Sequence, residues 1–157
     1  MNKLLIIFCF LSIFHFSKSQ NISNETIVTF TDYFIQVVKG MSKNETNQFC
    51  VNILKEKKQE LVNLFIIAFD SLTKGKLDIS AFGPYIFTFY ECSDLYALIL
   101  NLLTIQDYNI KQYGLNMMKK AKFIDKNMQV IMGNNNINST LFSVGKILSA
   151  ILGFQFK

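Results

Sequence analysis

The sequence predicts an all-α protein, a single-domain bundle of about five helices held by one disulfide between Cys50 and Cys92. Three observations lead to this fold class. Apolar residues recur every three or four positions over most of the chain, which is the period of an amphipathic helix. Breaks between these segments are few, and the strongest is the lone proline, Pro84. Roughly 138 residues beyond an N-terminal leader suit one domain with a sizeable core.

The leader, residues 1–19, has the pattern of a secretory signal peptide. Lys3 precedes an apolar run from Leu4 to Phe16, and Ser17 and Ser19 supply the small residues that a signal peptidase requires. The run of about 13 residues is too short to cross the roughly 30 Å hydrocarbon core of a bilayer. We therefore expect residues 20–157 to form one domain in the secretory lumen or outside the cell, with no transmembrane span after cleavage.

Loss of the leader removes His15, the only histidine, and the rest of the chain contains no tryptophan and no arginine. Ser-His-Asp and Cys-His catalysis and histidine-ligated metals are therefore excluded. No glycine-rich phosphate loop, Cys-x-x-Cys pair or acidic calcium loop is present. The sequence predicts no cofactor and no metal site.

The charge is mildly positive. The formal net charge of +5 becomes +3 when Lys3 and Lys18 leave with the leader, and lysine alone carries the excess. Nucleic-acid binding favours a concentrated basic face with arginine for bidentate contacts. We expect no nucleic-acid partner.

Two cysteines remain, Cys50 and Cys92, and an oxidising compartment favours their pairing. A free buried thiol and an intermolecular bridge are the alternatives. N-glycosylation is predicted at four Asn-x-Ser/Thr motifs, of which the first two compete: Asn21, Asn24, Asn44 and Asn138.

Two helices are expected before residue 75. Apolar spacing predicts the first over residues 25–39, with Gly40 as its C-terminal signal. The second is capped by Ser42 or Asn44 and extends to about Leu72. Lys57 falls on its apolar stripe, so either this side chain snorkels or the helix bends there.

Three more helices are expected after a connection that holds one short turn near residues 78–82. Pro84 suits the first turn of a helix over residues 85–105. A fourth helix extends from Asp107 to about Phe123 or, after a kink, to Met132. A final helix extends from Ser139 or Thr140 to residue 156.

The final helix carries a face of small residues, Gly145, Ser149 and Gly153, spaced four apart. Such a face lets a neighbouring backbone approach closely. The neighbour is either another helix of the same domain or a second copy of the chain.

Aromatic residues are abundant, with 16 phenylalanines and six tyrosines in the chain. Aromatic interiors of helical proteins are either filled or open as cavities for apolar ligands. For the open case we predict these ligand-contacting residues: Phe65, Phe69, Phe89, Tyr96, Met117 and Met118.

Two surface features complete the candidates. Lys119, Lys122 and Lys126 share a helix face near several methionines, a combination that suits anionic lipid headgroups or a protein partner. Glu91 and Asp94, three apart near Cys92, are the acidic pair that a carboxylate hydrolase would need.

The sequence therefore predicts a secreted protein with a non-catalytic binding or carrier role for an apolar ligand or lipid. The alternative is a structural or interaction subunit of an extracellular or lumenal assembly. A carboxylate-based hydrolase is the least favoured reading.

Overall fold

The computed structural model describes residues 23–43, 48–73, 81, 83–95, 97–98 and 107–156. The predicted signal peptide lies outside these residues, as do Asn21, Asn44 and Tyr96. Seven helices are described: α2 (Asn24–Met41), α3 (Phe49–Glu56), α4 (Lys58–Thr73), α5 (Gly83–Thr88), α7 (Asp107–Lys119), α8 (Ala121–Gly133) and α9 (Ile137–Leu152). The all-α prediction is confirmed. The helix count exceeds the expected five because the second and the fourth expected helices are each divided in two.

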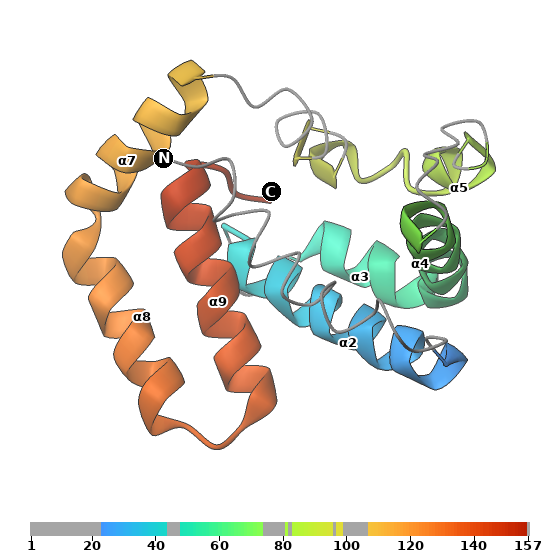
Figure 1. The fold of residues 1–157 in the computed structure, drawn as a ribbon, viewed down its shortest axis with the longest axis horizontal. Helices are drawn as coiled ribbons and strands as arrows, with labels where there is room; N and C mark the ends of the chain where they lie inside the picture. The colour runs from blue at the N-terminus through green and yellow to red at the C-terminus, as the bar shows by residue number, and fades with distance from the viewer. Residues whose placement is uncertain are drawn as a thin grey trace.

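The helices form successive layers (Figure 1). The two central helices, α2 and α9, make the most extensive contact of the described chain. On the outer side of α9 lie α7 and α8, while α3 and α4 lie on the other side of α2. The outer pair α7–α8 is therefore joined to the rest of the described molecule chiefly through α9.

The first helix is longer than expected at its C-terminal end. Its N-terminus is capped by Ser23, whose Oγ accepts a hydrogen bond from the Thr26 backbone N–H at 3.2 Å. Gly40 does not end α2, which continues to Met41. Gly40 instead provides the point of closest approach to α9, because a Cβ there would lie 3.0 Å from the Gly145 Cα and would overlap the Phe142 carbonyl oxygen.

The second predicted helix is interrupted at Lys57, and the bend is thereby confirmed. Lys57 adopts φ −99° and ψ 34°, between α3 and α4. Its Nζ donates to the Thr88 carbonyl oxygen at 2.9 Å, so the side chain reaches the C-terminal end of α5. The polar residue on the apolar stripe thus marks a helix junction.

The prediction of one helix over residues 85–105 is wrong. Within the described residues α5 ends at Thr88, residues 89–91 form a turn, and helical structure resumes at 93–95. The Cys92 N–H donates to the Phe89 carbonyl oxygen at 2.9 Å across this turn. The turn brings Cys92 against α3, where it pairs with Cys50 at a Cα–Cα distance of 5.1 Å.

The pairing of Cys50 with Cys92 is confirmed, and both residues are buried in the core. This core gathers apolar residues from α2, α3, α4, the described residues 89–98 after α5 and the chain end: Ile35, Val38, Met41, Val51, Ile53, Leu54, Leu61, Phe89, Leu95, Leu98 and Phe156. The disulfide therefore links elements that already share a core.

The fourth predicted helix has a kink at Lys120, with φ −107° and ψ 17°, between α7 and α8. Of the two lengths considered, the longer helix with a kink is the one observed, although the kink precedes Phe123.

The last helix starts and ends earlier than expected. Asn136, not Ser139 or Thr140, is its N-cap, because Asn136 Oδ1 accepts from the backbone N–H groups of Asn138 and Ser139. Gly153 ends α9 with a left-handed φ of 66°. The chain then returns to α2, where Lys43 N–H donates to the Phe156 carbonyl oxygen at 2.8 Å.

The small-residue face of α9 packs inside the domain. Gly145 and Ser149 are buried, and a Cβ on Gly145 would lie 2.9 Å from the Gly40 Cα. For these two residues, packing against a helix of the same domain is thus confirmed, whereas Gly153 caps the C-terminal end of α9. None of the helices in the described part of the chain combines the length and apolar character needed to cross a bilayer.

Candidate functional site

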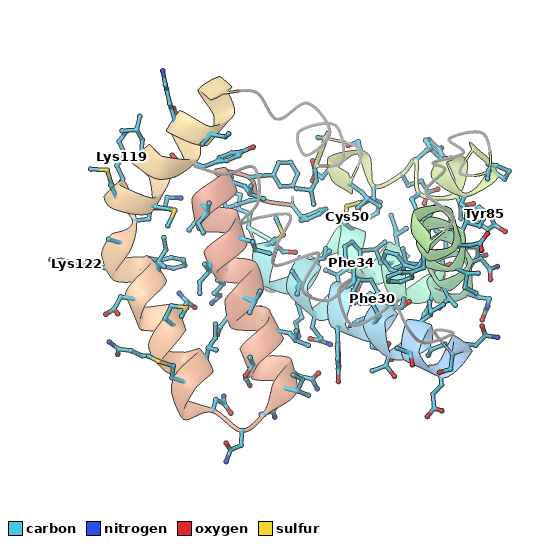
Figure 2. The ribbon with its side chains drawn as sticks, viewed as in Figure 1. Phe30, Phe34, Cys50, Tyr85, Lys119 and Lys122 are labelled. Atoms are coloured by element: carbon cyan, nitrogen blue, oxygen red, sulfur yellow. A yellow bond between two sulfur atoms is a disulfide. The ribbon has the colours of Figure 1, made fainter. Side chains whose placement is uncertain are left out.

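Two of the predicted ligand-contacting residues, Phe65 and Phe69, lie on α4 in an aromatic cluster with two phenylalanines of α2. The Phe30 ring meets Phe65 and Phe69 edge-to-face, with centroids 4.9 and 5.5 Å apart. Phe34 meets Phe65 in the same way at 5.3 Å. These rings contact one another between the two helices, so they contribute packing energy to the α2–α4 interface. Figure 2 shows the two members from α2, Phe30 and Phe34.

The other described residues of the set divide between the core and the surface. Phe89 is buried in the main core, against which Phe65 also packs, whereas Met117 and Met118 are exposed on α7. Helices α4 and α7 lie on opposite sides of the molecule (Figure 1). The described residues of the predicted set therefore do not meet in one site.

A second surface is more distinctive. Seven large apolar side chains of α7 and α8 are exposed, and together with the lysines of residues 119–126 they form what we call the methionine–lysine surface. Its apolar members are Leu115, Met117, Met118, Phe123, Met128, Val130 and Met132. Met118 and Met132 are the most open, at 76% and 74% exposure. Figure 2 shows Lys119 and Lys122 at the outer edge of this helix pair, directed away from α9.

The exposure follows from the geometry of α8. Ile124, Asn127 and Ile131, spaced three and four apart, are less exposed than their neighbours and form the stripe that faces α9. Helical spacing places Met128 and Met132 on one flank of this stripe and Phe123 and Val130 on the other. The apolar side chains of α8 therefore span a wider arc of its circumference than α9 covers.

The same helix pair carries the charge excess. Residues 107–133 contain five lysines and two aspartates, a net charge of +3, which equals the whole excess of residues 20–157. Elsewhere in residues 20–157, nine lysines are balanced by nine acidic residues. The exposed apolar side chains and the positive charge thus coincide on one part of the chain.

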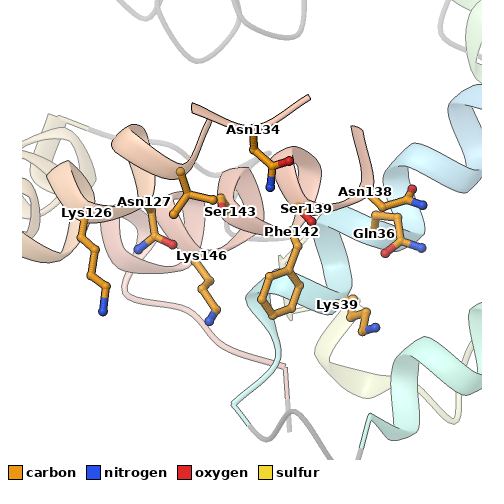
Figure 3. Close-up of a pocket in the computed structure, with 11 residues that line it drawn as sticks. Gln36, Lys39, Lys126, Asn127, Asn134, Asn138, Ser139, Phe142, Ser143 and Lys146 are labelled. Carbon is orange, nitrogen blue, oxygen red and sulfur yellow. The ribbon is translucent and has the colours of Figure 1, made fainter. Parts of the chain in front are cut away.

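A pocket of about 600 Å³ opens between α2, α8 and α9. Each helix contributes one lysine to its lining: Lys39, Lys126 and Lys146. Two of its polar residues, Asn127 and Ser143, are more than nine-tenths buried. In Figure 3 the three lysine side chains extend toward the same side of the pocket.

The remaining lining is amide and apolar. Gln36, Asn134 and Asn138 supply side-chain amides, and Phe142 and Val130 supply apolar surface. The Lys146 Nζ lies 4.6 Å from the centroid of the Phe142 ring, a cation–π contact. The lining contains no aspartate or glutamate, so the pocket is positive as well as polar.

The other described sequence candidates, apart from Asp94, occupy exposed positions. Asn24 and Asn138 are the two glycosylation acceptors within the described residues, and both are exposed to solvent. Glu91 is exposed as well, while Asp94 is half-buried. N-glycosylation remains a prediction at both asparagines.

Known proteins offer no guide to the site. No protein-family model matches the sequence, and no curated protein or solved structure is significantly similar to it.

The pocket was not predicted from the sequence. Gln36 and Lys39 lie in the first predicted helix, and Lys146 lies in the last, about 100 residues away. No local pattern shows that these side chains line one pocket, because their proximity depends on the crossing of α2 with α9. The methionines and lysines of α7–α8 were identified, since their proximity is visible along one helix.

Proposed function

We propose that this protein is a non-catalytic lipid-binding protein of the secretory route, which docks on anionic membrane surfaces through the methionine–lysine surface. The observation that carries the proposal is the coincidence of seven exposed apolar side chains with the entire net positive charge of residues 20–157 on one helix pair. Amphipathic helices of this composition lie in the membrane interface, with apolar side chains among the acyl chains and lysines at the headgroups.

The energetics favour a reversible, charge-dependent attachment. Each lysine near an anionic bilayer contributes about 1 kcal/mol, a contribution that salt screens. Apolar side chains add about 25 cal/mol for each Å² removed from water. Methionine suits this role because its unbranched side chain adapts to a disordered surface.

A vesicle-binding assay tests the proposal. We expect the protein to co-sediment with phosphatidylcholine vesicles that contain phosphatidylserine and to bind pure phosphatidylcholine vesicles much more weakly. The double substitution Met118→Ser and Met132→Ser should weaken binding by about tenfold or more, because two open apolar anchors are lost.

Matched controls lie outside α7 and α8. Tyr90→Ser removes a side chain that is 67% exposed but lies outside the surface, and it should leave binding unchanged. Lys122→Glu should weaken binding, whereas Lys55→Glu on α3 should have little effect. Equal binding to both vesicle types, or equal effects of the two lysine substitutions, would contradict the proposal.

A role as an interaction subunit is the alternative. The small-residue face that such a role was expected to use is buried against α2 through Gly145. An assembly partner would therefore bind to exposed apolar side chains instead, of which α7 and α8 carry seven. Native mass spectrometry of protein from its own source separates the two functions, since lipid binding predicts a monomer and an assembly role predicts a stoichiometric complex.

A further inference from the structure

We propose that the pocket between α2, α8 and α9 binds a phosphate ester, held by Lys39, Lys126 and Lys146. This proposal goes beyond membrane docking, because Lys39 and Lys146 lie outside the methionine–lysine surface. The pocket joins it only at Lys126 and Val130.

The sign of the ligand follows from the charges. Three lysines from three helices line the pocket without an acidic residue among the lining side chains. The N-terminal turn of α9 and the C-terminal turn of α8 both border the pocket, so their opposite helix dipoles offset each other. The lysines therefore determine the electrostatic potential in the pocket, which is positive. A group with two negative charges is stabilised most by this potential.

The size and the other lining groups indicate an organic phosphate. A volume of about 600 Å³ lies within the range of small-molecule sites and greatly exceeds a bare phosphate ion. The amides of Gln36 and Asn134 offer hydrogen bonds to ester or hydroxyl oxygens. Phe142 offers an apolar wall for the carbon part of the ligand.

Two of the lysines are suited to fixed contacts. Lys39 and Lys146 are half-buried, and the Lys146 Nζ is positioned over the Phe142 ring. Side chains restricted in this way lose less conformational entropy on binding than fully exposed lysines do. Lys126 is exposed and adds charge at the rim.

Phosphate esters come from two sources, a soluble metabolite or a lipid headgroup, and two probes distinguish them. Glycerol 3-phosphate is titrated by calorimetry and by NMR of the full chain. Vesicles of phosphatidylcholine with phosphatidic acid test the lipid form. Because the methionine–lysine surface is itself proposed to bind anionic vesicles, the vesicle test compares the wild type with the variant Lys39→Gln with Lys146→Gln. Loss of phosphatidic acid vesicle binding in this variant identifies a headgroup site, whereas binding of glycerol 3-phosphate with unchanged vesicle binding identifies a soluble ligand.

Paired variants separate this site from membrane docking. Lys39→Gln with Lys146→Gln should weaken glycerol 3-phosphate binding by about tenfold or more, through loss of two charge-assisted contacts. The same pair should leave phosphatidylserine vesicle binding nearly unchanged. Met118→Ser with Met132→Ser should do the reverse, so either proposal can fail while the other stands.

Two controls test whether loss of positive charge elsewhere, or a glycan on Asn138, affects binding. Lys43→Gln with Lys55→Gln removes equal charge outside the pocket and should leave glycerol 3-phosphate binding intact. Thr140→Ala abolishes the acceptor motif at Asn138 without changing a lining residue, and this variant should bind at least as well as the wild type. The proposal would be overturned if the Thr140→Ala protein failed to bind glycerol 3-phosphate and the Lys39→Gln, Lys146→Gln variant bound phosphatidic acid vesicles as well as the wild type does. Equal loss of glycerol 3-phosphate binding in the two lysine pairs would also overturn it.

Discussion

Gly145 shows how one missing side chain sets the distance between two helices. A Cβ at this position would overlap the Val37 carbonyl oxygen and lie 2.9 Å from the Gly40 Cα. Both glycines are buried where α2 crosses α9. Close backbone contact of this kind brings a large part of both helix surfaces out of water.

We expect Gly145→Ala to lower the free energy of unfolding by about 1–3 kcal/mol or more, because the backbone of α2 must move to admit the methyl group. Urea denaturation measures the change. Gly114→Ala on α7 is the matched control, since a Cβ there meets nothing within 4 Å. Helix propensity alone should then stabilise the protein by about 0.5–1 kcal/mol. If both substitutions changed the free energy of unfolding in the same direction, the claim that the contact of α2 with α9 requires a glycine at position 145 would be wrong.

The junction of α3 with α4 shows how one polar residue divides an apolar helix. Lys57 ends α3, and its ammonium group donates to the Thr88 carbonyl oxygen, which the end of α5 leaves without a helical partner. The junction therefore holds α5 in place from one side. The disulfide holds the turn after α5 from the other.

Lys57→Met retains the apolar stem and removes the donor, so it should cost about 1–2 kcal/mol of stability. Hydrogen exchange should become faster in residues 83–91, because α5 loses this anchor. Lys55→Met, at an exposed position on α3, should change stability by less than about 0.5 kcal/mol. Unchanged exchange in residues 83–91 would show that Lys57 does not anchor α5.

The tail after α9 connects distant parts of the molecule. Phe156 is fully buried in the main core, and its backbone is bonded on both sides, with its N–H donating to the Met41 carbonyl oxygen at 3.2 Å. Gly153 reverses the chain and permits this return. The tail thus fastens the end of α9 to the end of α2.

Phe156→Ala should lower the free energy of unfolding by about 3–5 kcal/mol, the cost of deleting a buried aromatic ring. The neighbouring exposed residue supplies the comparison, and Gln155→Ala should be nearly neutral. Thermal unfolding followed by circular dichroism measures both. Similar midpoints for the two variants would mean that the tail is not part of the cooperative fold.

Local pattern predicted the helical class correctly and identified Lys57 as the point where the second helix either bends or buries a lysine stem. The pairing of Cys50 with Cys92 was predicted from the count of cysteines and the expected compartment. Apolar spacing reports helix period directly, and Lys57 interrupts that spacing visibly in the sequence. Cys50 lies on the buried face of α3, whereas Cys92 follows the turn after α5 and lies outside the helix that was expected to carry it. The methionines and lysines of α7–α8 were equally visible, because helix neighbours are near in sequence.

Contacts between distant segments decided the rest. Gly40 has the pattern of a helix end but lies at a helix crossing, and Phe156 has the pattern of helix continuation but turns back into the core. The pocket lysines come from helices separated by as many as about 100 residues. Sequence periodicity specifies which face of a helix is buried, whereas only three-dimensional packing specifies which neighbour covers that face and which side chains then meet.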